Sequence, residues 1–77
     1  MASSNIDPVI VGRVLANTRI GMGITQEAAS EAAGIGRSHL SAIENGVRKP
    51  TMATFYRICL ALGVPMSTVL QEVETLM

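Results

Sequence analysis

The chain has 77 residues, of which 48% are hydrophobic. This length and this share of apolar residues predict one small domain with one hydrophobic core over residues 1–77. Its single cysteine, Cys59, excludes an internal disulfide, and no apolar run approaches the about 18 residues that a membrane span needs. Six basic side chains balance six acidic ones, which argues against binding to polyanions through net charge alone.

Apolar residues recur every three or four positions along nearly the whole chain, which predicts an all-α protein with five short helices. The expected helices cover residues 8–21, 25–34, 37–45, 51–62 and 65–76. Pro8 suits a first helical turn, Thr25 suits an N-cap, and Gly34 suits a C-terminal cap. The first four helices, residues 8–64, would form most of the core. In the later helices the side chains expected to face inward are Leu40, Ile43, Met52, Phe55, Ile58, Cys59 and Leu62.

The charges are distributed unevenly along the chain. Residues 1–64 carry all six bases and four acids, whereas residues 65–77 carry only two acids. Arg37, Arg48 and Lys49 lie close together in the sequence, so one face of the domain is expected to be modestly basic. Ordinary scattered surface charge is the alternative interpretation.

Catalysis and metal binding find little support in the residue types present. The one histidine and the one cysteine stand 20 positions apart, and a zinc site needs three or four ligands. The two G-x-G stretches lack a third glycine at the required position, and no predicted strand precedes them. We therefore expect a protein that is not an enzyme and that uses no metal or cofactor.

The N-terminal stretch MASSNIDPVIVG contains no basic segment followed by a long apolar run, so no signal peptide is expected. A cytoplasmic location is the resulting expectation, and the single cysteine fits a reducing compartment.

The second and third helices, joined by the tight turn Gly34-Ile35-Gly36, form a predicted helix-turn-helix. The outward face of the third helix is short and polar, and a face of that size fits the major groove of DNA. Arg37 can donate two hydrogen bonds to guanine, Ser38 and Ser41 can reach base edges or phosphates, and Ala42 can contact a thymine methyl group.

These motifs resemble the helix-turn-helix family of phage repressors and Cro, often called the XRE family. The matching residues are Val11, Gly12, Leu15 and Arg19, then GITQE at 23–27, AG at 33–34, RSHLSAIENGVRKPT at 37–51 and FxxIxxALGV at 55–64. The resemblance covers roughly residues 11–70 and implies a compact, five-helix, lambda-repressor-like domain that binds double-stranded DNA.

The resemblance also implies roles for individual residues. The third helix would be the recognition helix, with Arg37, Ser38, Ser41 and Ala42 facing bases. Backbone phosphates would be bound by Gln26, Asn45, Arg48 and Lys49. For His39, packing at the helix edge and binding of a phosphate both remain open. Arg19 and Glu44 would form an internal ion pair between the first helix and the recognition helix.

Three positions depart from the family pattern. Ala29 stands where the family has leucine, and Met22 or Met52 is expected to fill the volume lost from the core. Ser30 stands where alanine is usual, so its hydroxyl needs a partner such as a carbonyl one turn back. Gly36 replaces serine or threonine and is a weaker helix cap.

The last expected helix, within residues 65–77, carries an apolar stripe that runs to the end of the chain. We expect part of it to close the core and the stripe as a whole to form a two-fold dimer interface; its residues are Met66, Val69, Leu70, Val73 and Leu76. Two recognition helices about 34 Å apart would then read a near-palindromic operator.

The function expected from the sequence is therefore that of a dimeric transcriptional regulator, acting as a repressor or autoregulator. An antitoxin, which would also bind a protein toxin, is an alternative within the same fold. A protein-interaction module that kept the fold but lost DNA binding is the alternative from a different class.

Overall fold

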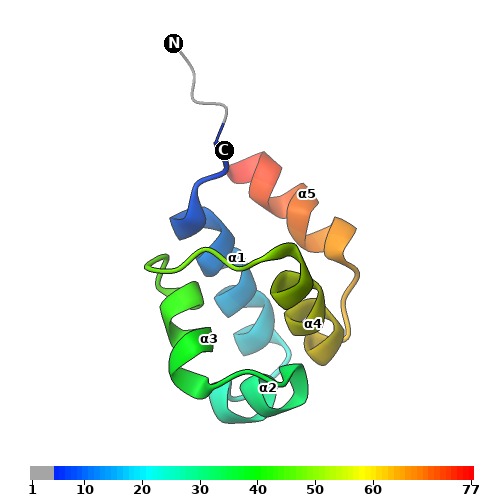
Figure 1. Ribbon diagram of the computed structural model, residues 1–77. Helices are drawn as coiled ribbons and strands as arrows, with labels where there is room; N and C mark the ends of the chain where they lie inside the picture. Colours follow the sequence, from blue (N-terminus) through cyan, green and yellow to red (C-terminus); the bar gives the residue numbers. More distant parts are fainter. Residues whose placement is uncertain (1–4) are drawn as a thin grey trace.

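The computed structural model describes residues 5–77, and within that range it consists of five helices without a strand (Figure 1). They are α1 (Pro8–Gly21), α2 (Gln26–Ala33), α3 (Arg37–Glu44), α4 (Met52–Leu62) and α5 (Met66–Leu76). The expected all-α fold is confirmed, and every helix end lies within one residue of its predicted position. The first four residues of the stretch considered as a signal peptide lie outside the described residues.

Local side-chain chemistry explains where the helices begin. The hydroxyl of Thr25 accepts a hydrogen bond from the backbone N–H of Ala28 at 3.1 Å, and Thr51 accepts one from Thr54 at 3.1 Å. Each bond satisfies an N–H group that the first turn of a helix leaves unpaired. Gly36, at the start of α3, makes no such side-chain bond, as its lack of a hydroxyl predicts.

Helix α1 runs through the middle of the domain and packs against α3, α4 and α5, while α2 packs against α3 and α4 (Figure 1). The core lies between these surfaces. Its completely or almost completely buried side chains include Val14, Leu15, Leu40, Ile43, Ile58 and Val69. Because α1 contacts both α3 and α5, it fixes the position of the expected recognition helix relative to the end of the domain.

Neither methionine expected to fill the space beside Ala29 does so. Met22 is 50% exposed and Met52 is 69% exposed, although Ala29 itself is buried. Met22 follows the last residue of α1, and Met52 is the first residue of α4. Both therefore lie at a helix end, outside the turns that carry the buried residues of these helices. The expectation that Met52 faces inward was wrong for the same reason.

Within residues 5–77, no single helix is long and apolar enough to cross a membrane, although α4 and α5 reach the required length and composition as a pair bent by 108°.

Candidate nucleic-acid interface

The turn between α2 and α3 is closed by backbone hydrogen bonds. Gly34 adopts φ +70, a left-handed conformation that glycine adopts without steric cost, and its N–H donates to the carbonyl of Glu31 at 3.1 Å. The N–H of Ile35 donates to the carbonyl of Ser30 at 3.0 Å. These bonds satisfy two of the last four carbonyls of α2 and set the direction in which α3 begins.

Ser30 lies buried on the inner side of this turn. Its hydroxyl donates to the carbonyl of Glu27 at 3.0 Å, so the expectation of a partner one turn back is confirmed. The small, satisfied side chain lets α2 lie close to its neighbours without an unpaired polar atom.

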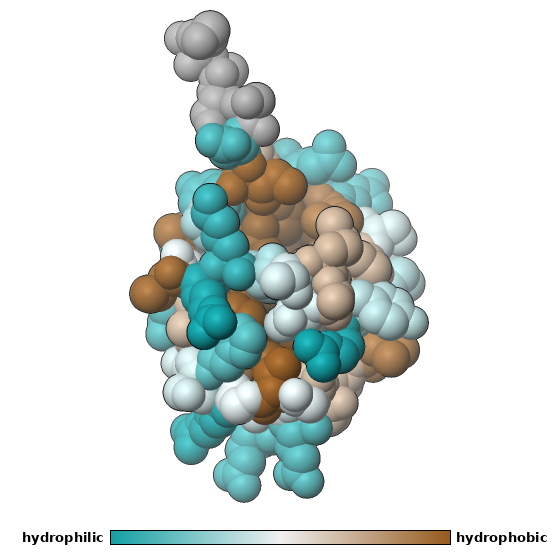
Figure 2. Space-filling model, viewed as in Figure 1, coloured by the Kyte–Doolittle hydropathy of each residue, from teal (hydrophilic) through white to brown (hydrophobic). Residues whose placement is uncertain are grey.

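Helix α3 has one buried face and one outward face. Leu40 and Ile43 are at most 1% exposed and anchor the helix to the core. The predicted base-contacting residues share the outward side, where Arg37 and Ser38 are exposed and Ser41 and Ala42 are half-buried. Figure 2 shows side chains of hydrophilic and intermediate hydropathy where α3 lies. In the loop after α3, the apolar side chain of Val47 is also 82% exposed.

Residues expected to contact phosphates border this outward face. Arg48 and Lys49 are exposed in the loop after α3, and His39 is half-buried. The N–H groups of Val47 and Arg48 donate to the carbonyl of Ala42 at 3.0 and 3.2 Å, which folds this loop back against α3. The chain thus places two cations beside the end of α3.

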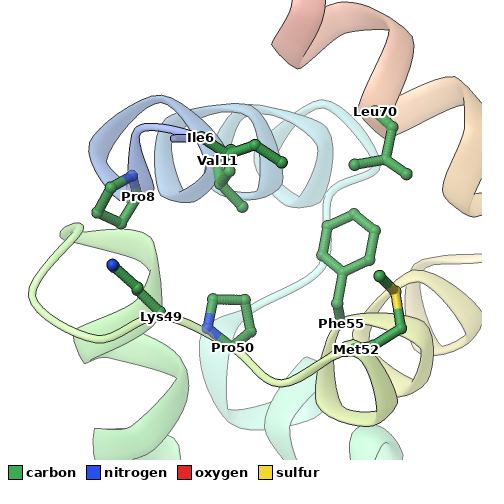
Figure 3. Close-up of a pocket in the computed structure, with 8 residues that line it drawn as sticks. All are labelled: Ile6, Pro8, Val11, Lys49, Pro50, Met52, Phe55 and Leu70. Carbon is green, nitrogen blue, oxygen red and sulfur yellow. The ribbon is translucent and has the colours of Figure 1, made fainter. Parts of the chain in front are cut away.

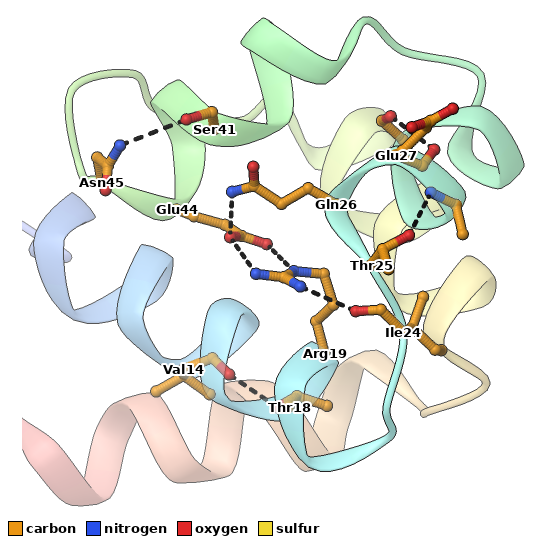
Figure 4. A network of polar contacts seen from close by, with 12 residues as sticks. Val14, Thr18, Arg19, Ile24, Thr25, Gln26, Glu27, Ser41, Glu44 and Asn45 are labelled. Carbon is orange, nitrogen blue, oxygen red and sulfur yellow. Dashed lines mark hydrogen bonds and ion pairs between the residues drawn. The ribbon is translucent and has the colours of Figure 1, made fainter.

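Asn45 forms a hydrogen bond with Ser41, a predicted base-contacting residue. Its side-chain N–H donates to the hydroxyl oxygen of Ser41 at 3.4 Å (Figure 4). Because Ser41 accepts in this contact, the hydrogen of its own hydroxyl is free to donate to a base or a phosphate.

Arg19 and Glu44 form a bidentate ion pair between α1 and the last residue of α3. The guanidinium Nε and Nη2 donate to the two carboxylate oxygens at 2.7 and 3.0 Å, and the side chains are 13% and 5% exposed. Arg19 Nη1 donates in addition to the carbonyl of Ile24 at 2.8 Å, in the loop before α2. The pair therefore connects α1, α3 and the loop before α2.

Glu44 has a second partner, which the sequence did not indicate. The side-chain Nε2 of Gln26 donates to Oε1 of Glu44 at 2.9 Å (Figure 4). Gln26 was expected only to bind a phosphate, and it stands 18 residues before Glu44 in the chain. No local pattern in the sequence marks such a contact, because it depends on how α2 and α3 pack.

The backbones of α1 and α3 are in direct contact at Gly12. A Cβ atom at this position would overlap the carbonyl oxygen of Ile43 and lie 2.7 Å from that of Glu44. The sequence indicated Gly12 only as part of the family resemblance. In the structure it permits α3 to lie against α1 without an intervening side chain.

The expected dimer stripe on α5 is divided between the interior and the surface. Val69 and Val73 are each 1% exposed and belong to the core of a single chain, so they are not available to a second copy. Met66 and Leu70 are half-buried, and Leu76 is 53% exposed. The available part of the stripe is thus smaller than predicted, because α5 uses its central valines to cover the core.

An apolar pocket of about 190 Å³ opens between α1, α4 with the loop before it, and α5 (Figure 3). Figure 2 shows apolar side chains gathered in a hollow on this face. Its lining residues are Ile6, Pro8, Val11, Lys49, Pro50, Met52, Phe55 and Leu70. The pocket explains where Met52 lies, since that side chain forms part of the rim rather than of the core. Among residues 5–77, no group of three metal-ligating side chains comes together.

Curated proteins similar to this chain include two transcriptional regulators. The uncharacterized HTH-type transcriptional regulator y4dJ of Sinorhizobium fredii is 40% identical over 55 residues, which cover 71% of each protein. The transcriptional regulator ClgR of Mycobacterium tuberculosis is 38% identical over 61 residues, or 79% of this chain. This chain spans only 54% of the length of that ClgR protein.

Solved structures share the fold. The crystal structure of the clp gene regulator ClgR from Corynebacterium glutamicum superposes with a TM-score of 0.88 at 26% identity and 96% coverage of both chains. The restriction-modification controller protein C.Esp1396I, solved as a tetramer in complex with its natural 35-base-pair operator, superposes with a TM-score of 0.78 at 23% identity, covering 92% of this chain and 99% of that one.

A family model described as helix-turn-helix matches residues 15–69, which are most of the chain. The matched segment contains the turn between α2 and α3, the Arg19–Glu44 ion pair and the whole of α4. The chain therefore belongs to this helix-turn-helix family, as its resemblance to the phage repressors and Cro predicted.

Proposed function

We propose that this protein is a transcriptional regulator, not an enzyme, and that it reads double-stranded DNA by placing α3 in the major groove. The outward face of α3 is the observation that carries the proposal. Leu40 and Ile43 hold one side of the helix in the core, while Arg37 and Ser38 project from the other. A rigid, short, polar helix face is the element that this class of protein uses to contact base edges. The similarity to y4dJ and ClgR, both named as transcriptional regulators, supports it.

The proposal assigns two sets of contacts. Bases are contacted by Arg37, Ser38, Ser41 and Ala42, and phosphates by Gln26, His39, Asn45, Arg48 and Lys49. Only the first set carries sequence information directly, whereas the second fixes register and orientation on the duplex. The proposed place of action is the cytoplasm.

We further propose that the protein acts as a two-fold dimer, as a repressor or an autoregulator. The part of α5 available to a second copy consists of Met66, Leu70 and Leu76. A two-fold pair of α3 helices about 34 Å apart would read a near-palindromic operator. The operator-bound tetramer of C.Esp1396I is one protein of this fold that assembles on DNA in more than one copy.

Selection from a random duplex library at near-physiological salt tests the proposal. We expect enrichment of a palindrome whose half-sites lie about one helical turn apart. Arg37→Ala should enrich a more degenerate site, while Arg13→Ala, which removes an equal charge from an exposed position on α1, should enrich the same site as the unchanged protein. A folded protein that enriches no sequence would refute the proposed function and would favour a role in protein interaction.

A further inference from the structure

Glu44 receives three hydrogen bonds at the junction of α1, α2 and α3. Two come from Arg19, at 2.7 and 3.0 Å, and the third comes from Nε2 of Gln26 at 2.9 Å (Figure 4). The carboxylate is 5% exposed, whereas Gln26, the first residue of α2, is half-buried and accessible from the surface. The buried ion pair therefore supports a side chain that reaches solvent.

This contact determines which way the Gln26 amide points. A carboxylate accepts hydrogen bonds and donates none, so it can bind the Nε2 end of the amide but not the Oε1 end. One hydrogen of Nε2 is used by Glu44, and the second is left for another acceptor. A DNA phosphate is also only an acceptor, so it must be bound by this second hydrogen.

Arg19 makes such an arrangement compatible with DNA. A carboxylate next to a bound phosphate would repel it, but the guanidinium of Arg19 neutralises Glu44 through two bonds. The third bond of Arg19, to the carbonyl of Ile24, holds the chain two residues before Gln26. Both the backbone that leads into α2 and the side chain at its first position are thereby fixed.

We propose that Glu44, held and neutralised by Arg19, is a positioning residue that presents the Gln26 amide to a phosphate of the DNA backbone. This inference rests on the proposed function. A glutamine side chain has several rotatable bonds, and ordering it on binding lowers affinity. The bond to Glu44 orders it before DNA arrives, so the ion pair contributes to DNA binding without contacting DNA.

A double-mutant cycle measured on DNA affinity separates positioning from a purely structural role. The duplex is the one enriched by the library selection. Gln26→Ala is compared in the unchanged protein and in Arg19→Met/Glu44→Leu, which replaces the ion pair by apolar side chains. In the unchanged protein Gln26→Ala should weaken binding by about tenfold, the size of one hydrogen bond to a charged group. In the apolar background it should weaken binding by less than about twofold, because the amide is no longer oriented.

Lys49→Ala is the matched control, because it removes a phosphate contact that Glu44 does not touch. It should weaken binding by the same factor in both backgrounds. Equal effects of Gln26→Ala in both backgrounds would overturn the positioning role, as would no effect in the unchanged protein. Failure of the unchanged protein to bind any duplex would instead overturn the proposed function.

A second measurement needs no variant. In the NMR spectrum of the free protein, one side-chain amide hydrogen of Gln26 should exchange slowly with solvent, because Glu44 binds it. On addition of the selected duplex, the other hydrogen should shift downfield. Two hydrogens that exchange equally fast in the free protein would overturn the proposal whether or not the apolar variant folds.

Discussion

Replacing Gly12 by alanine tests whether its contact with α3 sets the position of that helix, the proposed recognition helix. The added Cβ would lie 2.7 Å from the carbonyl oxygen of Glu44, where ordinary contact begins at 3.4 Å, and it would overlap that of Ile43. The end of α3 must therefore retreat by about 0.7 Å or more, and backbone atoms cannot turn aside as a flexible side chain can.

The magnitude follows from two opposing terms. Alanine in a helix is favoured over glycine by about 0.5–1 kcal/mol, but overpacking of this kind costs about 1–3 kcal/mol and occasionally more. With a backbone obstacle we expect the upper end, a net loss of about 2 kcal/mol, which lowers Tm by about 8–16 °C in a domain of this size. DNA affinity should fall as well, because Glu44 and the loop that follows it move with α3.

Gly21→Ala is the matched control, since it makes the same change in the same helix. An added Cβ at Gly21 meets nothing within 4 Å, and the residue has no positive φ. It should leave Tm unchanged or raise it slightly through the helix preference of alanine. Thermal unfolding followed by circular dichroism measures both variants. If Gly12→Ala melts as Gly21→Ala does, direct backbone packing does not hold α3, and the reasoning is refuted.

Three further results are expected. Arg37→Ala should lose about 1–3 kcal/mol of binding free energy on the preferred duplex and relax sequence preference, whereas Lys49→Ala should weaken binding to all duplexes and make the dependence of affinity on salt shallower by about one unit. Titrations at several salt concentrations measure both effects, and equal behaviour of the two variants would contradict the assigned roles. Leu76→Glu should yield monomers in sedimentation experiments with unchanged circular dichroism, because the side chain is 53% exposed and contributes little to the core; a persisting dimer would rule out this end of α5 as the interface. Burial raises the pKa of the Cys59 thiol, so a thiol reagent at pH 8 should react slowly until urea unfolds the chain; fast labelling of the folded protein would show that the thiol is accessible.

Features with a local cause could be predicted from the sequence. Thr25 caps α2 and Gly34 ends it through bonds within one or two turns, so the ends of the helices followed from short segments of sequence. The division of α3 into an inward face with Leu40 and Ile43 and an outward face with Arg37 followed from helical periodicity in the same way.

Features that depend on packing between distant segments could not be predicted. The bond from Gln26 to Glu44 joins α2 to the far end of α3, and the close approach at Gly12 depends on which backbone lies opposite it. Helical periodicity placed Val73 and Leu76 on one apolar stripe of α5. It did not indicate that packing against α1 would bury Val73 and leave Leu76 exposed. Met52 was placed in the core by the same periodicity, although it lies at the rim of a pocket.

The central position of α1 has a consequence for operator choice. It packs against both α3 and α5, so in the proposed dimer it connects α3, which would contact DNA, to α5, which would contact the second copy. The distance between the two α3 helices of the dimer, and hence the preferred number of base pairs between half-sites, is then set by how α3 and α5 pack on α1. Substitutions in the buried face of α1 would change the length of the spacer that the protein selects while leaving the preferred bases of each half-site the same.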